Sequence, residues 1–86
     1  MSKTVAYLAK FHANEDGSFT VTFPNFEGCI TEGKNIQETR SMAASALKQW
    51  LEYLQEEEGF ELPESVEDVT LAEHETEHWI SVTIDG

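Results

Sequence analysis

One stretch, residues 18–33, constrains the fold more than any other part of the chain. Its first residues alternate between polar and apolar side chains, which is the period of two of a strand with one buried face. The apolar members are Phe19, Val21 and Phe23. Pro24 then ends this strand, because proline lacks the N–H that a neighbouring strand would bond. We interpret Gly28 and Gly33 as turn positions where φ can be positive, and expect one short strand, 29–31, between them.

Two other segments, residues 4–12 and 78–84, alternate in the same way. Their apolar sides are Val5, Tyr7, Ala9 and Phe11 in the first, and His78, Ile80, Val82 and Ile84 in the second. The first of these segments is separated from the strand before Pro24 by residues 14–17, which end in Asp-Gly. Asp-Gly between two alternating runs is a strong hairpin signal, so the first two strands are predicted to be antiparallel neighbours.

A long helix is predicted over residues 36–58. Asn35 and Glu38 have the spacing of a capping box, in which each side chain bonds a free backbone N–H at the helix start. At about 100° per residue, the apolar side chains form one stripe. Its members are Ile36, Ala43, Leu47, Trp50 and Leu54, flanked by Ala46 and Leu51. We interpret Trp50 and Tyr53 as core and core margin rather than as a binding platform.

These elements predict an α+β fold of one domain, residues 1–86. The order strand, strand, short strand, helix, strand indicates an antiparallel-rich sheet of three to four strands with the long amphipathic helix on one face. Eighty-six residues suffice for a single modest core. Residues 65–75 combine a few apolar side chains with many acids, and both a short helix and an irregular crossing remain open for them.

Charge is distributed unevenly along the chain. The formal net charge is −12, and all five Lys and Arg residues lie at or before Lys48. The part of the chain after Lys48 therefore carries the whole net charge. Such a half would repel the phosphates of a nucleic acid and attract a basic protein surface. An ordinary solvated surface explains the same acids equally well.

The number of cysteines and the length of the apolar runs indicate where in the cell the protein resides. Cys29 is the single cysteine, so no disulfide can form within the chain. No run of residues approaches the roughly 18 apolar residues of a membrane span. We expect a cytoplasmic protein without membrane contact.

Two motifs invite an enzymatic interpretation. His74-Glu75-Thr76-Glu77-His78 matches the H-E-x-x-H zinc pattern, but that chemistry needs a helix and a third ligand, and the residues from Trp79 onward have the pattern of a strand. Cys29 could be a nucleophile with His12 as its base, although its position between Gly28 and Ile30 favours a small buried apolar residue. We therefore expect no zinc, no other cofactor and no catalytic site.

The motifs around Pro24 resemble a known family. Residues 23–29 read Phe-Pro-Asn-Phe-Glu-Gly-Cys and are followed by Thr31-x-Gly33 and, after the predicted helix, by Leu-Pro-Glu-Ser at 62–65. This order resembles the HicB family of bacterial antitoxins, with Asn25 where the family usually has Asp and Glu27 where it often has Pro. The resemblance covers about residues 4–66.

The resemblance implies a trimmed ribonuclease H fold, in which the last strand lies beside the first and parallel to it through a right-handed crossover. Ribonuclease H chemistry needs acids on the first strand, the helix and the last strand. Glu38 and Asp85 could fill two of these places, but residues 4–12 contain no acid. The constellation is therefore incomplete, and nuclease activity is not expected.

The resemblance also implies a function, a non-catalytic antitoxin domain that inhibits a small basic HicA-type toxin that cleaves messenger RNA. We expect a homo-oligomer, most simply a dimer, and no direct nucleic-acid binding. The candidate partner-binding residues are Glu56, Glu57 and Glu58, because carboxylates at a helix C-terminus face the negative end of its dipole, which local stability disfavours. A frayed and solvated helix end, where this penalty is small, is the alternative explanation for them. The alternatives are an orphan HicB-like domain with another regulatory or structural role and, more remotely, a residual hydrolase.

Overall fold

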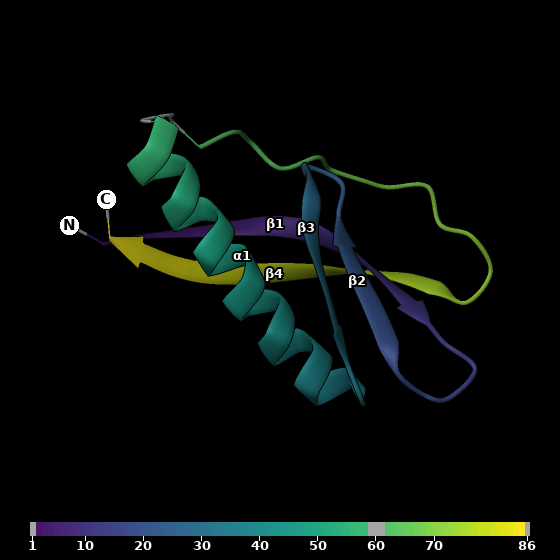
Figure 1. Ribbon diagram of the computed structural model, residues 1–86. Helices are drawn as coiled ribbons and strands as arrows, with labels where there is room; N and C mark the ends of the chain where they lie inside the picture. The colour runs from purple at the N-terminus through teal and green to yellow at the C-terminus, as the bar shows by residue number, and fades with distance from the viewer. Residues whose placement is uncertain (1, 59–61, 86) are drawn as a thin grey trace.

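Four strands and one helix form the predicted α+β layers (Figure 1). The computed structural model describes residues 2–58 and 62–85. The strands are β1 (Ser2–Ala13), β2 (Phe19–Phe23), β3 (Phe26–Gly33) and β4 (Glu75–Asp85), and the helix is α1 (Ile36–Glu58). Within the described residues, no helix has both the length and the apolar content needed to cross a membrane.

The sheet has the strand order β3-β2-β1-β4, and all three neighbouring pairs are antiparallel. The hairpin predicted between β1 and β2 is confirmed. Gly17 has φ 91° at its tip, and the Asn14 N–H donates to the Ser18 carbonyl at 2.8 Å. The apolar residues of β1 and β2 then face the same side, with Phe11 opposite Val21.

The turn after β2 is tighter than predicted, and the role assigned to the two later glycines is wrong. β3 resumes at Phe26 and contains both Gly28 and Gly33, neither of which has a positive φ. Both glycines instead allow α1 to approach. A Cβ at Gly28 would lie 2.7 Å from the Trp50 ring, and a Cβ at Gly33 would lie 2.6 Å from the Thr39 backbone.

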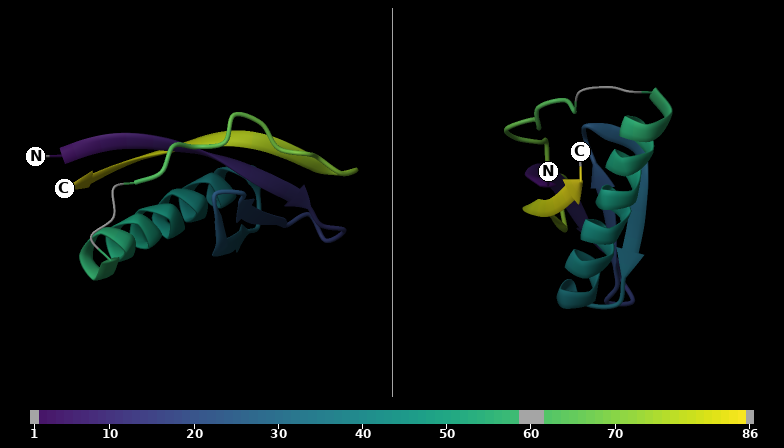
Figure 2. Two further views of the ribbon diagram at one scale, coloured as in Figure 1. Left: turned by 90° about the horizontal axis from the view of Figure 1, so that it is seen from above. Right: turned by 90° about the vertical axis from the view of Figure 1, so that its left-hand side faces the viewer.

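β4 lies beside β1 as the family resemblance implied, but the expected parallel direction is wrong. The pair is antiparallel, with Ser2 opposite Asp85 and His12 opposite Glu75. The reason is the path of residues 62–74, which travel the length of β1 before β4 begins, so that β4 returns towards the N-terminus (Figure 2). A parallel strand would have had to begin close to the end of α1.

Residues 62–74 form the irregular crossing, without a helix, and four polar contacts hold its first part. The Tyr7 hydroxyl donates to the Pro63 carbonyl, and the Leu8 N–H donates to Ser65 Oγ at 2.9 Å. The side-chain amide of Asn25 donates to the Glu64 carbonyl at 2.8 Å and accepts from the Val66 N–H at 2.9 Å. The crossing thus contacts the middle of β1 at Tyr7 and Leu8, just before Lys10, where the pairing of β1 with β2 begins.

α1 covers one face of the sheet, and the core lies between them. The buried apolar residues of the two layers are Tyr7, Ala9, Phe11, Val21, Phe23, Phe26, Cys29, Ala43, Leu47, Leu51, Ile80, Val82 and Ile84. The predicted helix stripe is confirmed except at Ile36, which is 42% exposed. Thr39 is buried in the first turn instead, and its hydroxyl group donates a hydrogen bond to the Asn35 carbonyl.

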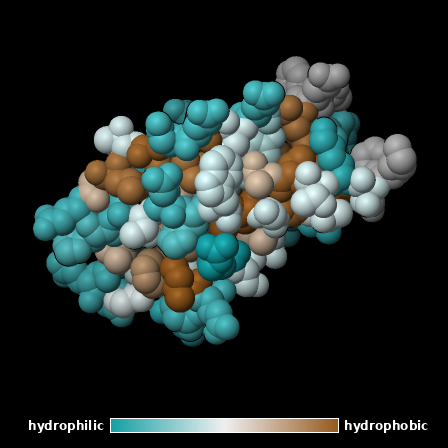
Figure 3. Space-filling view, turned by 180° about the vertical axis from the view of Figure 1, so that it is seen from behind, coloured by the Kyte–Doolittle hydropathy of each residue, from teal (hydrophilic) through white to brown (hydrophobic). Residues whose placement is uncertain are grey.

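The opposite face of the sheet is mostly polar. Seen from behind, its apolar side chains form separate patches among hydrophilic ones (Figure 3). Leu8 is fully buried although it alternates with Tyr7 and Ala9, which face α1. Residues 62–74 pass this side of β1 (Figure 2), and the Leu8 N–H donates to Ser65 Oγ there. Trp79 of β4 lies opposite Leu8 in the sheet.

Candidate functional site

The predicted partner-binding cluster lies at the end of α1. Glu56 is exposed in the last described turns, and this end of the helix carries no basic residue. The backbone of α1 continues to Glu58, but the side chains of Glu57 and Glu58 lie outside the described part of the structure. The cluster therefore stays a prediction, with Glu56 placed where a partner could reach it.

Cys29 and His12 are not brought together. Cys29 is 3% exposed in the core under α1, and burial raises the pKa of its thiol to about 11. A thiol with this pKa is protonated at neutral pH and is a poor nucleophile. His12 is exposed and alternates with the buried Phe11, so its side chain lies on the other face of the sheet.

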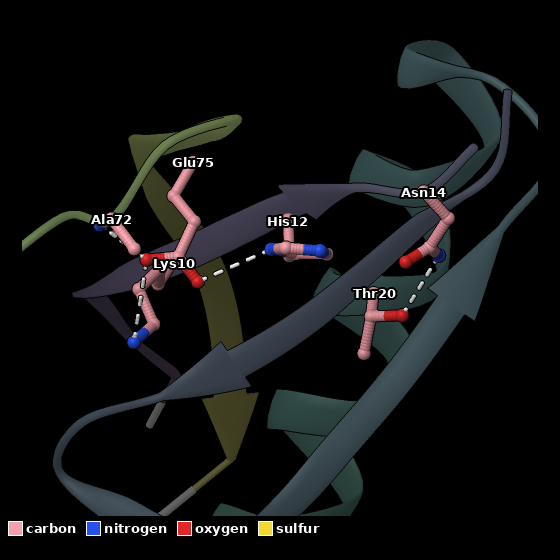
Figure 4. Close-up of polar contacts among 6 residues, drawn as sticks. All are labelled: Lys10, His12, Asn14, Thr20, Ala72 and Glu75. Atoms are coloured by element: carbon pink, nitrogen blue, oxygen red, sulfur yellow. Dashed lines mark hydrogen bonds and ion pairs between the residues drawn. The ribbon is translucent and has the colours of Figure 1, made fainter.

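His12 belongs instead to a polar cluster at the start of β4 (Figure 4). The Glu75 carboxylate accepts from the Ala72 N–H at 2.6 Å and lies 3.3 Å from His12 Nδ1 and 3.8 Å from Lys10 Nζ. These contacts lower the pKa of Glu75, the Ala72 hydrogen bond most and then the charges of Lys10 and His12. The cluster fixes the turn at His74, whose φ of 67° is the left-handed conformation.

The two histidines of the zinc-like motif lack the helical geometry that it requires. Glu75–Asp85 is a strand and His74 precedes it in a turn, so the histidines are not one helical turn apart. His78 packs its ring on Phe11, with 4.2 Å between ring centroids. The His78 Nδ1 accepts a hydrogen bond from Arg40 at 3.2 Å, and Nε2 lies 2.9 Å from Thr76 Oγ1. Both ring nitrogens of His78 therefore have partners within the fold.

Glu38 and Asp85 are the two acids that fit part of a nuclease constellation. They lie in different elements, Glu38 at the start of α1 and Asp85 at the end of β4. Glu38 closes the helix cap, since the Asn35 side chain accepts from the Glu38 N–H at 2.8 Å and the Glu38 carboxylate accepts from the Lys34 N–H at 3.3 Å. The start of α1 and the end of β4 lie towards opposite ends of the molecule (Figure 2). The side chain of Asp85 lies outside the described residues.

The structure also contains a surface that the sequence interpretation missed, a groove of about 520 Å³ between β3 and α1. We call it the edge groove. It is lined by residues 28–30 of β3 and by Ala46, Gln49, Trp50 and Tyr53 of α1. Tyr53 is 55% exposed and Ile30 59% exposed, so the interpretation of Tyr53 as core margin is wrong. The helical spacing of Ala46, Gln49, Trp50 and Tyr53 was the available signal, since these residues share one side of a helix.

Three comparisons relate this chain to known proteins. A family model described as "HicB_like antitoxin of bacterial toxin-antitoxin system" matches residues 7–85. A search of curated protein sequences finds no match.

Two solved structures share the fold. A chain of a toxin–antitoxin complex from Streptococcus pneumoniae is similar with a TM-score of 0.76 at 22% identity, over 92% of this chain and 69% of that one. The N-terminal domain of the antitoxin HicB from Burkholderia pseudomallei is similar with a TM-score of 0.62 at 18% identity, over 94% of this chain and 99% of that one. At these identities the two structures show that the fold is shared.

Proposed function

Because this chain belongs to the HicB-like antitoxin family of bacterial toxin–antitoxin systems, we propose that it is an antitoxin that binds and inhibits a small basic toxin. We further propose that the toxin is of the HicA type and cleaves messenger RNA. The family match over residues 7–85 carries this proposal, because it includes the second half of β1 and all of the other strands and the helix. The chain then acts by covering the toxin rather than by chemistry of its own.

The charge of the chain supports a basic partner. The formal net charge is −12, and no Lys or Arg follows Lys48. Opposite net charges speed the encounter of two proteins and favour the correct partner over like-charged ones. The same charge opposes direct binding to nucleic acid, and we propose none for residues 1–86.

The positions of the reactive side chains support a binding role. The Cys29 thiol is buried, with its pKa raised to about 11, and His78 uses both ring nitrogens in contacts within the fold. Glu38 and Asn35 serve the helix cap. Each of these side chains has a structural task that explains its presence.

We also propose that the chain forms a homodimer. Two chains of net charge −12 repel one another, so the dimer interface has to exclude most of the acidic residues. Sedimentation velocity over a range of concentrations and salt tests this. A mass that stays that of one chain at the highest concentration and salt would contradict the dimer.

Inhibition of a toxin is the direct test of the proposed function. The candidate toxin, sought as a small basic protein encoded beside this chain, would be purified and its cleavage of a messenger RNA followed while this chain is added. We expect cleavage to stop when the two proteins reach equal concentration. If cleavage continues at a large excess of this chain, the chain is instead a HicB-like domain with another partner.

A further inference from the structure

The two edges of the sheet differ in a way that suggests how a partner docks. β4 and β3 are the edge strands of the described sheet. At β4, the Arg40 guanidinium donates to the Trp79 carbonyl at 3.3 Å and to His78 at 3.2 Å. A charged side chain on an edge carbonyl blocks the addition of another strand. At β3, by contrast, the edge borders the edge groove.

α1 extends an apolar stripe beyond the sheet on the β3 side. Met42 and Ala46, one turn apart, and Tyr53, two turns further, lie beside the core stripe of α1 on the side that borders β3. Met42 is 44% exposed and Tyr53 55% exposed. In a sheet covered by a helix, such a stripe normally packs on a strand. Here it overlooks the position that a fifth strand, next to β3, would occupy.

Gly28 and Trp50 shape the floor of this position. The Trp50 ring lies on Gly28, where a Cβ would come within 2.7 Å of it, and this contact leaves the β3 edge open beside residues 28–30. An extended segment can therefore pair with the backbone of β3. Alternate side chains of the segment would enter the groove beside the helix stripe. The side chains between them would lie beside Ile30, which alternates with the buried Cys29 and so lies on the other face of the sheet.

The charges around the groove define the chemistry of the segment. Exposed carboxylates lie before and after the groove on both elements: Glu27 and Glu32 on β3, and Glu38 and Glu56 on α1. Lys34 adds a single opposing charge near Glu38. A segment that alternates apolar residues with Lys or Arg would fill the groove and pair its charges with these acids.

We propose that the edge groove binds an extended, basic segment of the toxin, which adds to the sheet as a fifth strand next to β3. This inference rests on the proposed function and names the surface that performs it. A second copy of this chain is a poorer occupant, because a two-fold β3–β3 pair brings the same acidic strands together, and like charges across strands are destabilising.

The test uses the toxin that the cleavage assay identifies, in a variant that no longer cleaves messenger RNA. We expect Tyr53→Ala and Ile30→Ala each to weaken its binding to this chain about tenfold, as substitutions at the centre of an interface do. Trp79→Ala is the matched control, a large apolar residue that is 49% exposed on the β4 edge, and should leave binding unchanged. Thermal melts of all three variants show whether the fold is intact.

Amide hydrogen exchange provides a second readout that does not depend on variants. We expect the partner to slow exchange at residues 28–32 and to leave β4 unchanged. Full affinity in Tyr53→Ala and Ile30→Ala, with no protection at β3, would overturn the strand site while leaving the proposed function intact. If β3 becomes protected when the concentration of this chain is raised without the partner, the groove binds a second copy of the chain. That result would overturn the inference. A wild-type chain that does not bind the toxin contradicts the proposed function itself.

Discussion

At the scale of single residues, Gly28 is explained by a contact rather than by a turn. The Trp50 ring occupies the place of its missing side chain. Trp50 in turn is half-buried and joins the core to the edge groove. One small residue on β3 thus sets both the distance between helix and sheet and the shape of the groove.

Gly28→Ala should therefore destabilise the protein by about 1–3 kcal/mol, the usual cost of overpacking. Urea denaturation measures this free energy of unfolding, and the near-ultraviolet circular dichroism of Trp50 should change with it. In a Trp50→Leu background the same substitution should cost much less, since the clash is removed. Equal costs in both backgrounds would show that Trp50 is not the reason for the glycine.

His78 links stability to pH. Arginine can only donate, so His78 Nδ1 accepts from Arg40, and the proton on Nε2 is donated to Thr76 Oγ1. Burial, and secondly the charge of Arg40, lower the pKa of His78 below its ordinary 6.5. The contribution of neutral His78 is then complete above about pH 6.5 and is lost as the pH falls towards the lowered pKa, because the unfolded chain binds the proton first.

We expect the free energy of unfolding of the wild type to fall more steeply from pH 6.5 to 5 than that of His78→Gln. Urea denaturation across this range measures both slopes, and the common effect of the carboxylates cancels in their difference. His74→Asn serves as the control, since His74 is exposed in the turn before β4 and its left-handed backbone conformation also suits Asn. Parallel curves for wild type and His78→Gln would contradict the linkage.

At the scale of elements, the irregular crossing of residues 62–74 is the part that sets the topology. Asn25, in the turn between β2 and β3, holds the crossing with a donor and an acceptor on one side chain, bonded to the Glu64 carbonyl and the Val66 N–H. Aspartate, which the family motif usually carries here, could make only the second of these bonds.

Asn25→Asp should therefore lower stability by about 1 kcal/mol, the net worth of one hydrogen bond. Asn25→Ala loses both bonds and should cost more. Chemical denaturation gives the two free energies, and amide exchange at Val66 should rise most in the alanine variant. An aspartate variant as stable as the wild type would show that the Glu64 contact contributes nothing.

At the scale of the whole molecule, the proposed role of charge in binding a basic partner can be tested at the end of α1. Glu56→Lys, Glu57→Lys and Glu58→Lys together should leave the melting temperature unchanged or raise it, because each replaces an acid at the negative end of the α1 dipole, worth about 0.3–1 kcal/mol per charge. The same variant should bind the toxin more slowly, and the wild-type association rate should fall steeply with salt.

Stopped-flow mixing at low and high salt measures these rates. The matched control changes Glu64, Glu67 and Asp68 to Lys, which alters the net charge equally on the exposed crossing. If both triple variants associate equally slowly, net charge alone guides the encounter. If the α1 variant associates as fast as the wild type, the three glutamates are only a solvated helix end.

The strands and the helix could be predicted from the sequence, because their signals are local. Alternation over residues 4–12 and 78–84, Asp-Gly at the first turn and the Asn35 cap each depend on neighbours in the chain, and the structure confirms all of them. The long helix likewise ends at the predicted residue, Glu58.

Other features of the fold depend on contacts between residues that are far apart in the chain. The direction of β4 follows from Tyr7 and Asn25 capturing the crossing some 40 to 60 positions away, and no local pattern in residues 62–74 records this. Gly28 shows its purpose only when Trp50 lies on it. The edge groove is lined by residues of both β3 and α1. It depends on how the helix packs beside the strand, so neither segment shows it alone.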